Sequence, residues 1–300
     1  MYWYSIIDVL NTVIVSFECL FGYAMREQKQ CHVAGFPISH SLSPNLFALV
    51  HEHLNLKWEM PSKIETSEID EIFNSRQQNS ASTEFKEMVK KTTESNTGDC
   101  FEFQNIPVIE INHKEQDFDG FPHWGSITTP LKHELGVTAA NCYTIDERGL
   151  RYSMTDGYAV ILVAEEFGID FYSKPVLHLK GGGSASIATA KAWLSMGGQI
   201  KAINGRRCLP DELLRKCNSQ LSPDLFIDFD ESSDSDYLVL FPHYSSKLIF
   251  DKGKIDGRWM LIAQHLLAWA VLFSPENAEK LPSLNLLFKR LVSLESLINQ

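Results

Sequence analysis

The chain has little of what would suit a metal site or a nucleic-acid partner. Its six cysteines include no C-x-x-C pair and share no spacing with histidine that is typical of zinc sites. We therefore expect no metal and six reduced thiols in an intracellular protein. Acidic residues outnumber basic ones, 38 to 27, and the basic residues form no stripe. Nucleic acid is an unexpected partner for such a surface.

Long, clean hydrophobic runs are also missing. The most apolar stretch, residues 6–25, is interrupted by Asp8, Asn11 and Glu18, and it has no basic region of the kind that opens a signal peptide. We interpret residues 1–30 as an N-terminal extension. We expect no membrane anchor and a cytoplasmic location.

What is present suits two modest α/β domains. The chain has 300 residues, of which 44% are hydrophobic and 22% are charged, so each domain can bury a core. The segment 31–60 predicts a strand, a Pro/Ser turn, a helix from about Pro44 to Leu54 and a second strand. From about residue 74 to residue 99 the sequence is rich in Ser, Thr, Asn and Gln. This composition predicts a poorly ordered insertion.

A second unit is clearer. Pro175–Lys180 predicts a strand, "GGGSAS" a glycine-rich turn, Ile187–Met196 a helix and Gln199–Ile203 the next strand. Strand, glycine turn, helix and strand make a βαβ unit with parallel strands. We expect a Rossmann-like, parallel-sheet domain built on this unit.

The glycine turn points to a nucleotide. A pyrophosphate needs a tight turn after a strand, a backbone that it can approach and a helix N-terminus with free N–H groups. A plain flexible turn is the alternative interpretation. The candidate cofactor-binding residues of this turn are Gly181, Gly182, Gly183, Ser184 and Ala185.

The end of the following strand indicates which nucleotide. A site that prefers NAD usually places Asp or Glu here, to bind the ribose hydroxyls. This chain instead has Asn204, Gly205, Arg206 and Arg207. Two guanidinium groups can bind a phosphate and no carboxylate repels it, so the pattern favours NADP over NAD. A solvated turn remains the alternative for the two arginines.

Four separated motifs then resemble one family. They are "GFPISHSLSP" (Gly35 to Pro44), "SITTPLK" (Ser126 to Lys132), "TDG" (Thr155 to Gly157) and "DGRWMLIAQ" (Asp256 to Gln264). In this order they resemble the shikimate dehydrogenases and the related quinate dehydrogenases, and "LNLKWEMPSKIETSEIDEIF" is similar to the eukaryotic quinate/shikimate branch.

The resemblance implies a fold and a reaction. The fold has a substrate-binding domain over residues 31–155, a Rossmann-like domain over 156–256 and C-terminal helices over 257–300 that return to the substrate domain. The reaction is the reversible, NADP-dependent reduction of 3-dehydroshikimate to shikimate without a metal, as in aromatic amino acid biosynthesis or quinate metabolism. A monomer or a homodimer is expected.

The resemblance also implies roles for single residues. Lys132 and Asp156 are the implied catalytic pair, since a cation beside the reacting oxygen stabilises an alkoxide and can deliver a proton. Ser41 and Ser43 are implied to bind the substrate carboxylate, although Ser43 before Pro44 could equally cap a helix.

Four further roles follow from the same resemblance. Thr128, Asn141 and Gln264 are implied to bind the substrate ring, and Gly257 lets the backbone approach the nicotinamide. Asn141 follows two alanines and could equally be a turn residue.

The chain departs from the family in places. Only the eight residues "HELGVTAA" separate Lys132 from Asn141, where the family has a further helix. We find no counterpart of the family's substrate-contacting tyrosine segment before Asp256, and Trp259 replaces a small glycine close to the expected nicotinamide. Two alternatives therefore stay open: an NAD-dependent quinate dehydrogenase, and a degenerate protein that binds ligand without turnover.

Overall fold

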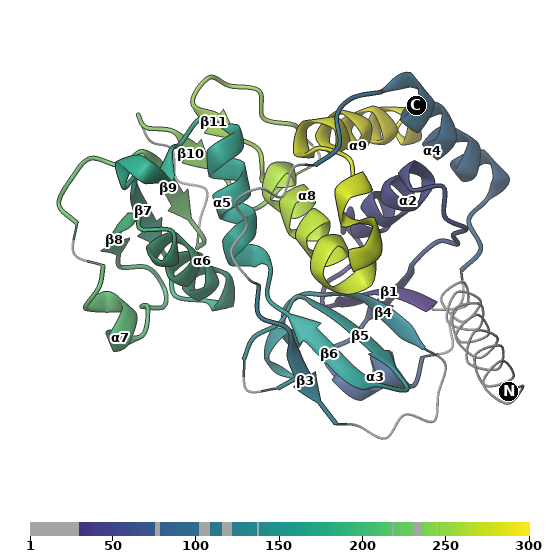
Figure 1. The fold of residues 1–300 in the computed structure, drawn as a ribbon, viewed down its shortest axis with the longest axis horizontal. Helices are drawn as coiled ribbons and strands as arrows, with labels where there is room; N and C mark the ends of the chain where they lie inside the picture. Colours follow the sequence, from purple (N-terminus) through teal and green to yellow (C-terminus); the bar gives the residue numbers. More distant parts are fainter. Residues whose placement is uncertain are drawn as a thin grey trace, which may run out of the picture.

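The computed structural model describes residues 30–75, 79–101, 109–115, 122–136, 138–217, 219–230, 236–245 and 247–300. The predicted N-terminal extension lies outside these ranges, except for Gln30, which begins the first strand. Two sheets with helices around them make the expected two-domain α/β fold (Figure 1). Within the described ranges, every helix is too short or too polar to cross a membrane.

The first sheet has the strand order β2-β1-β4-β5-β6-β3. Strand β1 pairs in parallel with β2 and β4, and the pairs β4/β5, β5/β6 and β6/β3 are antiparallel. Helix α2 (Ser43–His53) connects β1 to β2, so the first strand and the helix are confirmed, while the second strand begins at Ser62, later than predicted. The strands are β1 (Gln30–Gly35), β2 (Ser62–Glu65), β3 (Asn112–Lys114), β4 (His123–Ile127), β5 (Cys142–Asp146) and β6 (Gly149–Ser153).

Helices cover both faces of this sheet. Figure 1 shows α2, α4 (Thr83–Ser95), α8 (Gly257–Ala268) and α9 (Leu284–Ile298) together on one side, and α3 (Ile69–Phe73) on the other. Neighbouring residues of β1 point to opposite faces, so Val33 joins the core beneath the large helices and Ala34 joins the core with Ile72 of α3. The last helices thus pack against α2 and α4 of the first domain.

Helix α4 corrects the prediction of a poorly ordered insertion over residues 74–99. The Ser82 side chain accepts a hydrogen bond from the Phe85 N–H and caps the helix, and Val89 is buried against the core. Arg290 of α9 donates to the carbonyl oxygens of Thr93 and Asn96, each at 3.0 Å, at the other end of α4. A narrow apolar face and a distant arginine stabilise this polar helix, and composition alone shows neither.

The second sheet is entirely parallel, with the order β11-β10-β9-β7-β8. Helix α6 (Ser184–Ser195) joins β7 to β8, so the predicted βαβ unit is confirmed, although the helix begins earlier than expected and directly after the glycines. The strands are β7 (Val176–Lys180), β8 (Gln199–Ile203), β9 (Leu225–Asp228), β10 (Val239–Leu240) and β11 (Lys254–Ile255).

The second domain has few helices after β8. Helix α7 (Asp211–Leu214) has only four residues, and the described residues between β9 and β11 contain no helix. A parallel connection needs a dozen or more residues to hold a helix, and only ten residues separate β9 from β10. The remaining short helices of the chain are η1 (Leu131–His133), η2 (Phe171–Ser173), η3 (Trp269–Phe273) and η4 (Pro275–Lys280).

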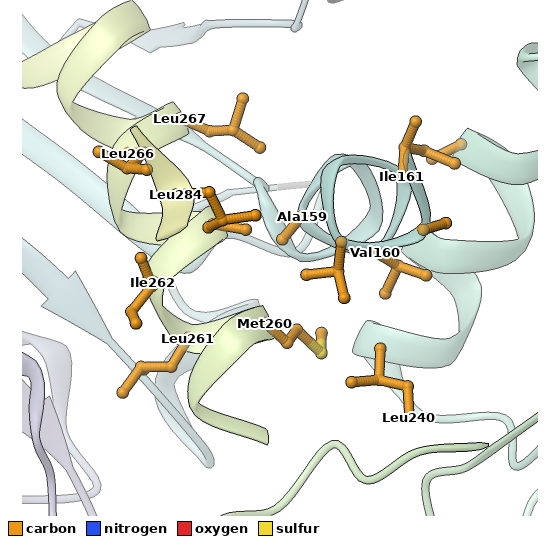
Figure 2. Packing of buried hydrophobic residues seen from close by; sticks show 14 of the residues in the cluster. Ala159, Val160, Ile161, Leu240, Met260, Leu261, Ile262, Leu266, Leu267 and Leu284 are labelled. Atoms are coloured by element: carbon orange, nitrogen blue, oxygen red, sulfur yellow. The ribbon is translucent and has the colours of Figure 1, made fainter. Parts of the chain in front are cut away.

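Helix α5 (Asp156–Glu166) joins the two domains, because it packs on both α6 and α8. Figure 2 shows Ala159 and Val160 of α5 facing the α8 side, with Met260 and Leu240 close by. Larger side chains of this kind, such as Val160 and Leu240, each contribute about 1.5–3 kcal/mol when fully buried. An added Cβ at Gly157 would clash with the carbonyl oxygen of Ala188 in α6, so the glycine of "TDG" permits this close helix contact. The packing fixes the start of α5, where Asp156 lies.

Candidate active site

A large cavity of about 730 Å³ lies between residues of both domains. Gly181, Gly182 and Asn204 do not line it, while every other candidate site residue does. The candidates that line the cavity are Ser41, Ser43, Thr128, Lys132, Asn141, Asp156, Gly183, Ser184, Ala185, Arg206, Arg207, Gly257 and Gln264.

Lys132 and Asp156 form an ion pair inside this cavity, between Nζ and Oδ2. Their side chains are 13% and 2% exposed, so little water competes with the contact. Lys132 comes from η1 in the first domain, and Asp156 is the first residue of α5, where a helix N-terminus favours a negative charge. The pair is therefore placed by two separate elements.

The short segment after Lys132 still holds the lysine in place. The Lys132 carbonyl accepts a hydrogen bond of 2.7 Å from the Ala140 N–H, which closes the segment into a compact loop. Leu131 and Leu135 are buried in the core on that side of the sheet. Gly136 packs against the Tyr152 hydroxyl so closely that an added Cβ would clash with it. A loop with buried leucines thus stands where the sequence lacks the further helix of the related family.

Asn141 holds Asp156 from its other side. The Asn141 amide nitrogen donates to Asp156 Oδ1 at 2.8 Å and to Thr155 Oγ1 at 2.9 Å, and its oxygen accepts from the Thr155 N–H at 2.9 Å. The Thr155 hydroxyl also donates to the Gln264 carbonyl at 3.0 Å. Each hydrogen of the amide has an acceptor, so Asn141 is oriented by the protein itself. Sequence reasoning missed Thr155 as part of the site, although it belongs to the "TDG" motif.

Cys142 follows Asn141 but is no nucleophile. Burial, helped by the nearby Asp156 carboxylate, raises the pKa of the Cys142 thiol well above its ordinary value. Because only the thiolate is reactive, this cysteine is an inert packing residue beside the site.

Three hydroxyl groups lie near the start of α2. The Ser41 oxygen accepts from the Ser43 N–H at 3.3 Å, and the Tyr244 hydroxyl oxygen accepts from the Leu42 N–H at 3.4 Å. Tyr244 also hydrogen-bonds Ser41, and burial raises its pKa, so the phenol stays protonated at neutral pH. Sequence reasoning found no such tyrosine. The signal would have been "FPHYSS", a tyrosine shortly after strand β10.

Ser43 does not cap α2. The residue at the N-cap position is Leu42, which has an α-helical backbone and makes no capping hydrogen bond through its side chain. The alternative interpretation of Ser43 as a helix cap was therefore wrong, because the helix begins at Ser43 itself. Pro44 occupies the first turn, where its missing N–H costs nothing.

Gly183 presents open backbone to the cavity, while Gly181 and Gly182 shape the turn without lining the cavity. Gly181 has φ of +110°, which favours glycine, and an added Cβ at Gly182 would clash with the Cys208 carbonyl. At Gly183 an added Cβ would meet no atom within 4 Å. Gly183 is also the N-cap of α6 and has no side chain to occupy the first N–H groups of the helix. These features fit a dinucleotide pyrophosphate, whose oxygens need donors and close approach.

The two candidate arginines differ in their surroundings. The Arg206 N–H donates to Asp230 Oδ2 at 2.6 Å, and its guanidinium donates to the Asp230 carbonyl at 3.1 Å. Arg207 lines the cavity and pairs with no side chain in the described part of the chain. Gly205 permits the Asp230 contact, because an added Cβ would clash with that carboxylate. Asp230 was missed, because it follows β9 and not β8, where the carboxylate that binds the ribose usually stands.

The start of α8 places Gly257 at the cavity wall and Trp259 away from the cavity. An added Cβ at Gly257 would approach the Phe241 and His243 carbonyl oxygens to 2.6 and 2.8 Å, so the glycine permits close backbone packing at the cavity wall. Trp259 stacks on Phe288 with 4.1 Å between ring centroids, and it does not line the cavity. The expectation that this indole lies close to the nicotinamide was therefore wrong, because α9 offers it an aromatic partner.

This chain resembles known proteins in its structure but not detectably in its sequence. No family model matches the sequence, and no curated protein matches it. Shikimate 5-dehydrogenase from Thermus thermophilus, in complex with shikimate, matches with a TM-score of 0.55 and 18% identity over 91% of this chain and 100% of that one. The fold is that of the shikimate dehydrogenases.

Other shikimate dehydrogenase structures agree with this result. Shikimate dehydrogenase 1 from Peptoclostridium difficile matches with a TM-score of 0.53 and 14% identity, over 91% of this chain and 100% of that one. The match to the Thermus enzyme in complex with NADP(H) and shikimate covers 89% of this chain and 99% of that one, with a TM-score of 0.55 and 18% identity. On this shared fold, the described residues contain no cluster of His, Cys, Asp or Glu that could hold a metal ion.

Proposed function

We propose that the protein is an NADP-dependent oxidoreductase of the shikimate dehydrogenase type that interconverts 3-dehydroshikimate and shikimate. The ion pair of Lys132 and Asp156 carries this proposal, because it lies in a cavity lined by hydroxyl groups of one domain and by the N-terminus of α6 of the other. Solved structures with this fold include a complex with NADP(H) and shikimate, which supports the same pair of ligands here.

Lys132 is the residue that handles charge and proton. When bound, the nicotinamide supplies or accepts a hydride at the ring carbon. As a ketone is reduced, negative charge grows on its oxygen, and the Lys132 ammonium stabilises that charge and donates a proton from Nζ. In the opposite direction the neutral amine accepts the proton of the ring hydroxyl.

Asp156 keeps Lys132 in position for that transfer. One of the three ammonium donors is used by Asp156 Oδ2, which leaves others for the substrate oxygen. Asn141 binds Oδ1 of the same carboxylate, so the carboxylate cannot rotate away from the lysine without breaking a buried hydrogen bond. Gln264 and Thr128 line the same part of the site and supply groups for the ring hydroxyls.

The hydroxyl groups of Ser41, Ser43 and Tyr244 suit a carboxylate. All three line the cavity and can donate an O–H to an anion without adding net charge. A ring acid bound there would have its carboxylate near the start of α2. The glycine turn would hold the cofactor pyrophosphate, and Arg207 the additional phosphate of NADP.

The assay that tests this function follows NADPH consumption with 3-dehydroshikimate and NADP reduction with shikimate. We expect turnover in both directions with the purified wild-type protein. Calorimetry with the same ligands accompanies the assay. Tight binding without any turnover would replace this proposal by the degenerate, ligand-binding protein, and neither binding nor turnover would reject both.

One observation favours a second candidate, an NAD-dependent quinate dehydrogenase. Asp230 lies at the cavity beside the glycine turn, and its side chain is 11% exposed. A carboxylate near the adenosine ribose favours the free hydroxyls of NAD and repels the phosphate of NADP. Rates with NAD and NADP at matched concentrations, each with shikimate and with quinate, separate the two candidates.

A further inference from the structure

A buried histidine lies directly behind one of the cavity serines. His265 follows Gln264 on α8, and its Nε2 is 2.9 Å from Ser43 Oγ. His265 is 1% exposed and Ser43 is 5% exposed, but only Ser43 lines the cavity. The imidazole is held edge-on against the Phe47 ring, with 4.8 Å between centroids. The histidine therefore does not line the cavity itself and is hydrogen-bonded to it through the serine.

The surroundings of the ring decide which nitrogen carries its proton. Burial lowers the pKa of His265 to about 3, so the imidazole is neutral at physiological pH. Its Nδ1 is buried and has no hydrogen-bond partner. A buried N–H group without an acceptor is rare and costs free energy. An unprotonated Nδ1 in the same place costs less. The favoured tautomer carries the proton on Nε2 and donates it to Ser43 Oγ.

We propose that His265 is a positioning residue that turns the Ser43 hydroxyl into the cavity as a donor for an anionic ligand group. An oxygen that accepts from the imidazole cannot donate to it, so the serine proton points elsewhere. The open side of Ser43 is the cavity. The ligand class is the carboxylate of a ring acid, and in this respect the inference rests on the proposed function.

The tautomer can be tested without any substrate. Nitrogen-15 NMR of histidine-labelled full-length protein distinguishes the Nε2–H and Nδ1–H forms, and the His265→Gln spectrum assigns the signal. We expect the Nε2–H form, unchanged between about pH 5 and pH 8. The Nδ1–H form, or a ring that titrates near neutral pH, overturns the proposal whether or not the protein turns over shikimate.

The effect on the ligand is tested with shikimate and its uncharged methyl ester. We expect His265→Leu to raise the KM for shikimate about tenfold with little change in kcat, because one hydrogen bond to a charged group is misdirected. The methyl ester should be affected far less. His265→Gln, whose amide can still donate to Ser43, should recover much of the loss.

A matched control and a double variant complete the test. His113 is exposed on β3, so His113→Gln should behave as wild type. In the Ser43→Ala background, His265→Leu should have no additional effect on KM. Equal losses for shikimate and its ester, or additive losses in the double variant, would assign His265 a packing role and overturn the proposal. An inactive wild type would reject the proposed function instead, and the NMR result would still decide the tautomer.

Discussion

Asn141 donates a hydrogen bond of 2.8 Å to the same Asp156 carboxylate whose other oxygen contacts Lys132. The amide comes from the start of β5, and the carboxylate from the start of α5. Because both oxygens of Asp156 are engaged, the carboxylate is held between Lys132 and Asn141, which fixes the direction of the ion pair. This relationship links stability and chemistry at one point.

Replacing Lys132 should abolish most of the chemistry. We expect Lys132→Ala to lower kcat by roughly 10²–10⁴-fold, because the group that stabilises charge and transfers the proton is lost. Cofactor affinity should change little, since the glycine turn lies on the other domain. Steady-state kinetics and calorimetry with NADPH check both points. Lys90→Ala, at an exposed position of α4, is the control, and an active Lys132→Ala variant would contradict the assigned role.

Thr155, the first residue of "TDG", should contribute to stability through its hydroxyl group. Thr155→Val keeps the shape but removes a hydroxyl that is fully buried between Asn141 and the Gln264 carbonyl. We expect unfolding in urea to show a loss of about 1–3 kcal/mol, since buried partners are left unsatisfied. Thr155→Ser, which keeps the hydroxyl, should lose clearly less. Equal losses in both variants would mean that the methyl group, and not the hydrogen bonds, is responsible.

Two glycines should respond to alanine in opposite ways. Gly183→Ala places a methyl group in open space at the turn, so stability should stay near wild type while NADP binds at least tenfold more weakly. Gly157→Ala should destabilise the fold by about 1–3 kcal/mol, because the methyl group meets the Ala188 carbonyl. Thermal unfolding and cofactor titration separate the two effects. A Gly183→Ala variant with unchanged NADP affinity would remove the turn from the cofactor site.

Asp230 should tune the choice of cofactor. Asp230→Asn removes the negative charge beside Arg206 and frees that guanidinium for phosphate. We expect the ratio of kcat/KM for NADP over NAD to rise by about tenfold, which corresponds to one modest charge interaction. Asp211→Asn, at the exposed start of α7, is the matched control. Asp224 is unsuitable, because its carboxylate accepts a hydrogen bond from the Val176 N–H. An unchanged ratio would place Asp230 outside the cofactor site.

Buried histidines should make the protein sensitive to mild acid. Burial lowers the pKa of His32 and His51 to about 4, and of His123 and His265 to about 3. Because these pKa values lie below that of the unfolded chain, the unfolded state binds more protons between about pH 4 and pH 6.5, and stability falls as pH falls through this window. Each histidine contributes at most about 1.4 kcal/mol per pH unit.

Urea unfolding at several pH values between about pH 5 and pH 7.5 measures this slope. The His265→Gln variant should show a shallower slope than wild type, since one depressed titration is removed. A stability that stays constant, or that rises on acidification, would contradict the neutral state of these histidines.

Much of the fold was predictable because local patterns determine it. The alternation from strand to glycine turn to helix around Gly183 identified the βαβ unit, and "GFPISHSLSP" identified the opening of the first domain. The polar helix α4 was not predictable in this way. Its stability comes from Val89 against the core and from Arg290, which lies far away in sequence. The candidate site shows the same division, since the motif residues gather at one cavity while Asp230 and Tyr244 reach it from weakly patterned loops.

By itself the sequence determined the order of elements, the parallel nucleotide-binding unit and the chemical types of the residues that gather at the cavity. Only the tertiary structure decided that Lys132 reaches Asp156 across a shortened loop, that Trp259 turns away to stack on Phe288, and that His265 stands behind Ser43. The physical reason is range. Backbone periodicity and turn chemistry act between near neighbours, whereas burial, hydrogen-bond partners and pKa shifts depend on which distant segments pack together.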